Sequence, residues 1–158
     1  MTTDLKRRIL LKSSMAAGLT GAAVVSGLLT PRAVLAAWPK EAFSAKSKGD
    51  AMNSLFGSGD TAESAEIKIK APDIAENGAV VPVTISTDMA GVESMTIIAA
   101  ENPVPLTAHY VMGEGALGYV STRIKMGKTG DVVAVVKAGG KLHSAHKPVK
   151  VTIGGCGG

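Results

Sequence analysis

The residue best suited to chemistry is Cys156, the single cysteine of the 158-residue chain. Four glycines surround it in the last five residues: Gly154, Gly155, Gly157 and Gly158. Glycine samples the widest range of backbone conformations and costs the most entropy to order, so this sequence predicts a flexible arm. Five extended residues reach about 16–18 Å, and with no neighbouring side chains the thiol could enter a narrow channel of another protein. Because no base or cation adjoins Cys156 in sequence, the enzyme that receives the arm would have to activate it.

Other roles for this cysteine compete with that of a thiol on a flexible arm. A lone thiol excludes an internal disulfide framework and any multi-cysteine metal or iron–sulfur site built from this chain alone. An interchain disulfide is physically reasonable for an odd cysteine in an exported protein, whereas the all-glycine context disfavours burial. A prenylation box needs cysteine four residues from the end, and Cys156 is one residue closer. An enzyme that used Cys156 as its nucleophile would need a neighbouring base, which the tail lacks.

A terminal Gly-Gly pair also occurs in small carriers that hold sulfur as a C-terminal thiocarboxylate. Those carriers are cytoplasmic and have no export leader, which disfavours this alternative.

An arm needs a rigid base, and residues 149–153 (VKVTI) alternate apolar and polar side chains as a half-buried strand does. Further strand-like segments are 65–71, 79–87, 93–100, 106–112, 118–126, 131–138 and 141–146. Turn residues separate them, and the two-residue Gly139-Gly140 connection favours a tight primed hairpin turn. Eight short strands without helical periods between them predict an all-β, immunoglobulin-like antiparallel β-sandwich. The immunoglobulin cysteine pair is absent.

A short helical segment precedes the predicted sandwich. Residues 38–56 contain an apolar stripe, made by Ala42, Phe43, Met52 and Leu55 and broken near Gly49. One or two short helices are therefore expected to pack on the larger domain, followed by a linker at 57–60. The predicted organisation is 37–64 for the helical segment and linker, 65–153 for the sandwich and 154–158 for the arm.

Residues 1–36 have the composition of an export signal. A basic stretch with paired arginines (KRRILLK, 6–12) precedes an uncharged stretch at 15–29, and Val34-Leu35-Ala36 offers a cleavage site before Ala37. The R-R-x-Leu-Leu-Lys pattern resembles a twin-arginine (Tat) signal. The alternative is a membrane anchor, but a span needs about 20 strongly apolar residues, and this stretch is shorter and diluted with glycine. The sequence therefore predicts a periplasmic protein with no membrane anchor after processing.

The positive charge of the whole chain is concentrated in this leader. The chain has 17 Lys and Arg and 13 Asp and Glu, a formal charge of +4. The leader holds five of the basic residues and one of the acidic ones, so residues 37–158 contain 12 of each and are formally neutral. With one Trp, two Tyr and two Phe, the chain also lacks the aromatic side chains that stack on bases. A nucleic-acid partner is therefore not expected.

The three histidines do not predict a metal site. His143 and His146 are three residues apart in a predicted strand, so their side chains point to opposite faces and cannot chelate one ion. His109 alternates with apolar neighbours and is expected to be a packed or surface strand residue. The sequence contains no Ser/His/Asp order, phosphate loop or paired-carboxylate motif that indicates catalysis. We expect no metal, no resident cofactor and no catalytic residue.

Two polar segments remain open to more than one interpretation. Arg123 and Lys125 fall on one face of a predicted strand, where they could attract an anion or the acidic patch of a partner, although an ordinary solvated face is the simpler interpretation. Residues 76–78 (ENG) have turn chemistry and could lie near a partner interface.

Three segments resemble the SoxY family, the periplasmic carrier proteins of bacterial thiosulfate oxidation. They are the tail 149–158 (VKVTIGGCGG), 74–83 (IAENGAVVPV) and 121–126 (STRIKM). The GGCGG ending is specific and the two internal segments corroborate it, so with the Tat-type leader the resemblance spans essentially the whole chain. Because Tat signals act on folded proteins, the leader also suggests a partner that is assembled before export.

The resemblance implies a non-catalytic swinging-arm carrier with Cys156 as the covalent attachment site. It implies a heterodimer with SoxZ and transient encounters with three enzymes. The cytochrome pair SoxXA joins thiosulfate to the cysteine, SoxB hydrolyses the terminal sulfonate, and in many pathways SoxCD oxidises the remaining sulfane sulfur. The glycines of the arm would supply flexibility and clearance. The alternative, a structural module that forms an interchain disulfide through Cys156, stays open at this point.

Overall fold

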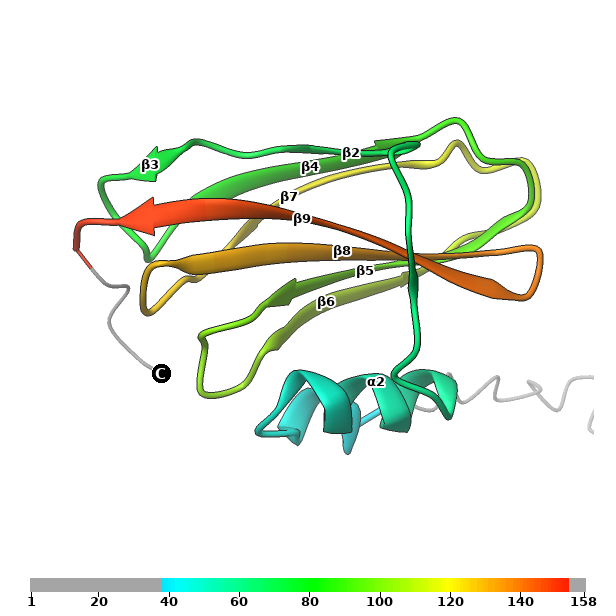
Figure 1. Cartoon of the computed structure of the whole chain (residues 1–158), viewed down its shortest axis with the longest axis horizontal. Coiled ribbons are helices and arrows are strands. Elements are labelled where there is room, and N and C mark those ends of the chain that lie inside the picture. The colour runs from blue at the N-terminus through cyan, green and yellow to red at the C-terminus, as the bar shows by residue number, and fades with distance from the viewer. Residues whose placement is uncertain (1–37, 154–158) are drawn as a thin grey trace, which may run out of the picture. The chain divides into compact units, whose positions relative to one another are not determined.

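The computed structural model of the protein describes residues 38–153 (Figure 1). Two short helices come first, η1 (Ala42–Ser44) and α2 (Lys48–Phe56). The strands that follow are β1 (Ala62–Glu63), β2 (Ile67–Lys70), β3 (Ile74–Ala75), β4 (Val81–Thr87), β5 (Val92–Ala99), β6 (Leu106–Val111), β7 (Tyr119–Ile124), β8 (Gly130–Ala138) and β9 (Lys141–Val151). Within this range, no helix is long and apolar enough to cross a membrane.

The strands form two sheets that pack face to face, which confirms the predicted all-β sandwich. The larger sheet has the order β1-β9-β8-β5-β6, and β3 also pairs with β9. The smaller sheet has the order β2-β4-β7. All neighbours are antiparallel except β1 and β3, which pair in parallel with the two ends of β9. The expected arm, residues 154–158, lies outside the described residues.

Two apolar clusters bury the two faces of the larger sheet. Between the sheets lie fully buried side chains such as Ile85, Ile97 and Val136. On the opposite face, Ile98 and Val135 are covered by η1 and α2. The helical layer explains why β5 and β8 are apolar along most of their length and do not alternate. The prediction that short helices pack on the larger domain is thus confirmed.

The break between the helices differs from the expected position at Gly49. The chain is non-helical at residues 45–47, and Gly49 lies inside the first turn of α2. Ser47 is the N-cap residue of α2. Its Oγ accepts a hydrogen bond from the Asp50 amide (3.1 Å), which satisfies a free amide of the first turn. Gly57 ends the helix with a left-handed φ of 72°, a conformation that glycine adopts without strain.

The last two predicted strands, 141–146 and 149–153, are a single strand, β9. Pro148 lies inside this strand although it has no amide hydrogen to donate. In a strand, the amides of residues 148, 150 and 152 face the same edge. The amides of Lys150 and Thr152 donate away from β8, to the carbonyls of Asp73 and Ala75. The nitrogen of Pro148 therefore faces the edge of β9 that is unpaired between β1 and β3. Its missing hydrogen interrupts no pairing with β8, which continues through residue 148.

The connection between β8 and β9 is the predicted primed turn. Both Gly139 and Gly140 have positive φ, 55° and 74°, as a type I′ turn requires. In contrast, the two-residue strands β1 and β3 were not expected, because sequences this short carry no detectable period.

Candidate functional site

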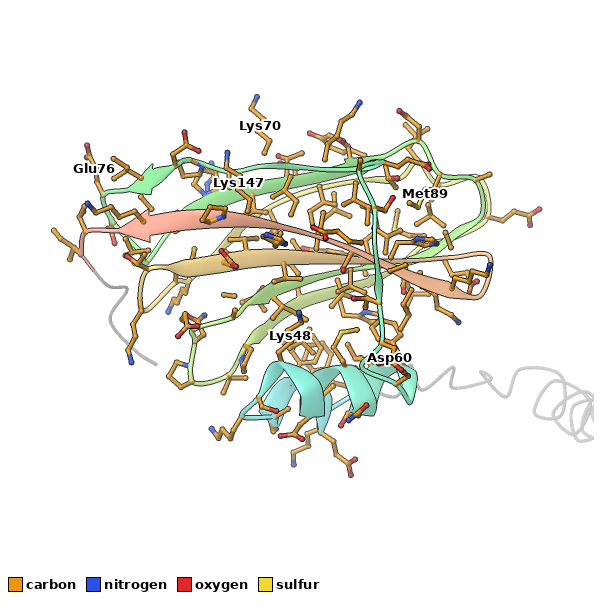
Figure 2. All side chains as sticks on the ribbon, viewed as in Figure 1. Lys48, Asp60, Lys70, Glu76, Met89 and Lys147 are labelled. Carbon is orange, nitrogen blue, oxygen red and sulfur yellow. The ribbon has the colours of Figure 1, made fainter. Side chains whose placement is uncertain are left out.

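The three segments that carry the family resemblance meet at one end of the sandwich, where β9 finishes. The backbone of β3 pairs with β9 through Ile74 opposite Lys150 and Ala75 opposite Val151. The end of β7 approaches the same place through the loop between β3 and β4. Figure 1 shows β3 beside the end of β9, and Figure 2 shows Glu76 at this end of the molecule. We call the contacts of residues 151–153 the arm root, because the chain continues from Ile153 to Cys156.

Gly78 links the end of β9 to the end of β7. Its amide donates to the Ile153 carbonyl at 2.8 Å, and its carbonyl accepts from the Met126 amide at 2.7 Å. Asn77 shapes this loop because its Oδ1 accepts from the Ala79 amide at 2.8 Å, forming an Asx turn. The predicted turn at 76–78 is thus confirmed, and its backbone holds the last described residue of the chain.

Two threonines complete the arm root. Thr152 donates its amide to the Ala75 carbonyl (3.1 Å) and its hydroxyl to the Glu76 carbonyl (2.9 Å). From the β8 side, the Thr129 hydroxyl accepts from the Val151 amide (2.9 Å) and lies 3.3 Å from the Val151 carbonyl, to which it donates. Hydrogen bonds on both edges of the chain therefore hold the end of β9 and the Ile153 carbonyl. Chain length alone limits Cys156 to about 10–11 Å from Ile153.

Replacing Thr129 with valine should loosen the arm root without unfolding the sandwich. Valine keeps the shape of threonine but removes both contacts to Val151, and one hydrogen bond contributes about 0.5–1.5 kcal/mol. We expect the Val151 amide to exchange with deuterium about 2- to 12-fold faster. Thr84→Val is the matched control, since it removes an exposed hydroxyl pair with Ser121 elsewhere on the sandwich. Equal exchange at Val151 in both variants would contradict a specific role for Thr129.

The loop between β7 and β8 is held beside the arm root by Asn102. Its Nδ2 donates to the Lys125 carbonyl (2.8 Å), and its Oδ1 accepts from the Gly127 amide (2.9 Å). This pairing orients the segment that carries Lys125 and Thr129. The predicted pair Arg123 and Lys125 is exposed, and neither residue forms an ion pair within residues 38–153.

Three exposed apolar side chains surround the arm root. Ile74, Val80 and Ile153 are 57%, 55% and 68% exposed, respectively. The site is therefore an apolar rim with charged side chains of both signs beside it, the basic Lys125 and the exposed acidic Glu76 (Figure 2). Among residues 38–153, no cluster of three or more His, Cys, Asp or Glu side chains is placed to hold a metal ion.

His109 is a packed strand residue. It lies on β6, where its Nδ1 is 2.8 Å from the hydroxyl of the buried Thr96, and its ring meets the edge of Phe56 at a centroid distance of 5.8 Å. Burial lowers the pKa of His109 because the charged imidazolium loses solvation. His109 thus joins β6 to the helical layer, on the opposite side of the larger sheet from the smaller sheet.

The half-buried position of His109 predicts a dependence of stability on pH. Because its pKa is lower in the folded state than the ordinary value of 6.5, the unfolded chain binds protons more readily. Its contribution to stability is present above that value and is lost as the pH falls through the lowered pKa. Urea denaturation at about pH 7.5 and about pH 5 should show this loss, and His109→Gln should reduce it. An unchanged loss in the variant would contradict the assignment.

His143 and His146 both lie on β9, three positions apart, so their side chains point to opposite faces of the strand. Only His146 has a charged neighbour, with its Nδ1 3.6 Å from Glu63 Oε1. The predicted site residues Cys156, Gly154, Gly155, Gly157 and Gly158 lie outside the described residues.

Sequence reasoning missed the residues that build the arm root. Thr129, Thr152 and Asn102 act through hydrogen bonds to backbone groups of distant segments, and no local motif indicates such contacts. The only sequence signal was indirect: Thr129 lies between Gly127 and Gly130, next to a predicted turn.

Comparison with known proteins gives one family and one closely similar structure. The family model described as "Sulfur oxidation protein SoxY" matches residues 52–156. The solved structure of the sulfur carrier protein SoxY from Chlorobium limicola f thiosulfatophilum is 44% identical, with a TM-score of 0.62. The match covers 73% of this chain and 100% of that chain. A search of curated proteins found no match.

A second solved structure has a weaker similarity. A superoxide reductase (neelaredoxin) from Ignicoccus hospitalis is 21% identical over 54% of this chain and 78% of its own, with a TM-score of 0.48. That value is too low to support an argument about this chain. The family model, in contrast, covers both the sandwich and Cys156, and the structure places its segments around the arm root. The chain belongs to the SoxY family of sulfur oxidation proteins.

Proposed function

We propose that this chain is a covalent carrier of sulfur intermediates, attached through Cys156 and presented to partner enzymes on the arm 154–158. The observation that carries the proposal is the position of the only thiol. It lies five residues beyond the end of β9 and three beyond Ile153, and this end of the chain is held by Gly78, Thr152 and Thr129. A fixed root with a short glycine-rich extension suits presentation to a separate active site. In addition, a homologue with 44% identity is a sulfur carrier protein.

Loading requires an oxidation. The thiol of Cys156 and thiosulfate would form a sulfur–sulfur bond, releasing one proton and two electrons and leaving a cysteine S-thiosulfonate. The electrons would pass to a c-type cytochrome, the role that SoxXA would have. In this proposal the chain supplies the thiol and the partner supplies the oxidant.

Release requires water. Hydrolysis of the terminal sulfonate would consume one water and give sulfate, two protons and a deprotonated persulfide that remains on Cys156. This is the role that SoxB would have, and SoxCD would oxidise the persulfide sulfur where the pathway includes it. Tethering keeps the intermediate at high local concentration while it passes between enzymes. The chain itself would be a non-catalytic subunit without a resident cofactor.

The remaining parts of the proposal concern location and assembly. The leader 1–36 would direct Tat export to the periplasm, and SoxZ would be the stable partner in a heterodimer exported with this chain. A second candidate, an interaction module that forms an interchain disulfide, is favoured only by the accessibility expected of an odd cysteine near a terminus.

Mass spectrometry of the mature protein, with and without thiosulfate, tests the proposal. In the presence of SoxXA and an electron acceptor, a carrier gains the mass of one thiosulfate on the peptide that contains Cys156, and a strong reductant removes it. Non-reducing electrophoresis separates the second candidate, which would appear as a covalent dimer before any thiosulfate is added. A dimer that never accepts thiosulfate would overturn the carrier function.

A further inference from the structure

The outer face of the smaller sheet is uncovered in the part of the chain that the structure describes. The helices cover the larger sheet, whereas β2, β4 and β7 have only their inner faces packed. The burial of β4 alternates regularly, with Val81, Val83 and Ile85 inside and the intervening residues outside. Figure 1 shows the smaller sheet on the side of the molecule away from α2.

This outer face carries positive charge only. Its basic residues are Lys68 and Lys70 on β2 and Arg123 on β7, and the three strands contain no Asp or Glu. None of the three basic side chains forms an ion pair within residues 38–153. Figure 2 shows Lys70 projecting away from the sandwich. The acidic residues closest in sequence to these strands lie beyond their ends: Glu66 and Asp88 at the end away from the arm root, and Asp73 and Glu76 at the arm root.

Between the charges the face is flat and polar. Thr84 pairs with Ser121 across β4 and β7, with the two hydroxyls 2.9 Å apart. A shallow hollow lies over β2 and β4 and is bordered by Pro72, Pro82 and Tyr119, a residue that is 57% exposed. The Cβ atoms of directly opposite residues on neighbouring strands are about 5 Å apart. The basic side chains of β2 and β7 therefore lie at the two sides of one continuous surface.

The same face continues into the arm root. Pro82 on β4 lies opposite Arg123 on β7, and Lys125 follows two residues later. The next residue, Met126, donates to Gly78, which in turn holds Ile153. The exposed Val80 extends the outer row of β4 in this direction. A protein that received the arm would therefore meet the apolar rim and, beside it, the basic face.

We propose that the outer face of β2, β4 and β7 docks the enzymes that receive the arm, through an acidic surface beside the entrance to their active sites. This inference rests on the proposed carrier function. The charge selects an acidic partner and disfavours a second copy, because a two-fold contact through this face would place like charges together. The scarcity of apolar side chains favours a transient contact over a permanent one, which would bury a more hydrophobic surface.

Such a contact acts mainly on the rate of association. Complementary charge raises association rates about 10- to 1000-fold at low salt, and the gain disappears as salt screens the charges. A carrier that visits several enzymes in turn benefits from fast association and fast release. The arm then supplies the specific contact, and the basic face brings it to the right entrance.

The test compares two variants with the same change in net charge. The face variant is Lys68→Glu/Lys70→Glu/Arg123→Glu. The control variant is Lys46→Glu/Lys48→Glu/Lys141→Glu, which reverses exposed charges on the helical segment and on the β8–β9 turn. The measurement is the rate at which SoxXA from the same cells loads thiosulfate onto Cys156 of the full chain with its partner subunit, followed by intact mass. We expect the face variant to load at least about tenfold more slowly at low salt, and the difference to vanish near 0.5 M salt.

The outcomes distinguish this inference from the carrier function. Equal loading of the face variant and the wild type at low salt would overturn the docking surface, and equal slowing of both variants would assign the effect to net charge. Amide NMR shifts on addition of SoxXA provide a second readout, expected on β2 and β7. Shifts there without any adduct would overturn the carrier function alone. If Lys68 and Lys70 bound anionic lipid vesicles and the face variant loaded normally, the proposal that this face docks a protein would be overturned.

Discussion

Cys156→Ser is expected to remove thiosulfate loading completely. Serine keeps the size of the side chain but forms no sulfur–sulfur bond, and Cys156 is the only cysteine in the chain. Intact mass spectrometry after incubation with thiosulfate, SoxXA and an electron acceptor should therefore show a single unmodified species. Stability should remain at the wild-type value, because the substitution lies beyond the last strand, β9, which ends at Val151. Loss of folding in this variant would indicate a structural role for the thiol.

A relocated thiol is the matched control for this variant. Cys156→Ser/Ser54→Cys keeps one cysteine but moves it to an exposed position on α2. Neutral alkylating reagents should modify this cysteine readily, whereas the enzyme should not load it, because a thiol on a rigid helix cannot reach a channel. Loading of the relocated thiol would show that SoxXA accepts any exposed cysteine, and the arm would lose its proposed purpose. Loading of Cys156→Ser itself would contradict the attachment site directly.

Retention of sulfur transfer would point to the second candidate function. If Cys156→Ser abolished a covalent dimer while sulfur transfer continued on another group, the thiol would be an assembly element. The structure makes the carrier interpretation the more economical one, because the hydrogen bonds of Gly78, Thr152 and Thr129 fix where the arm begins. An interchain disulfide gains little from a fixed root, whereas delivery into a channel depends on one.

The sandwich was predictable from the sequence, but the arm root was not. Alternation at residues 67–70 and 81–87 is local and repeats every two residues, so it predicts strands and their buried faces. The contact between Gly78 and Ile153 joins residues 75 positions apart through backbone atoms, which are the same in every residue type. The sequence supplied three recognisable segments, and only the fold shows that they meet.

The merging of the last two strands has a similar cause. Proline opposes strand pairing only where its missing amide hydrogen faces a neighbour, and the direction in which residue 148 faces depends on its partners, β1, β3 and β8. The helical layer, in contrast, has a local signature. Residues 132–136 are apolar throughout, and residues 95–99 are apolar except for Thr96. Neither segment alternates as a strand with one solvent-exposed face does, so both require cover on both sides.

That requirement leads to a second large effect, on stability. Ile97 and Ile98 are neighbours on β5 and both are completely buried, but they face different clusters. Ile97 packs between the two sheets, and Ile98 packs under η1 and α2. Truncating a fully buried isoleucine to alanine costs about 2–5 kcal/mol, because apolar contacts are lost and a cavity remains. If the helical layer is part of the folded core, Ile97→Ala and Ile98→Ala should each lower the free energy of unfolding within this range.

Urea denaturation of the two variants measures both costs, with Val111→Ala as the control. Val111 lies on the neighbouring strand β6 and is 79% exposed, so its truncation should change stability by less than about 0.5 kcal/mol. A cost for Ile98→Ala close to that of the control would mean that the helices pack only loosely on the sheet. Because His109 and Phe56 also join β6 to α2, such a result would remove the basis for the pH dependence predicted for His109. Equal large costs would instead establish that the carrier has a core on both sides of its larger sheet, which leaves the smaller sheet as the face that is free to meet a partner.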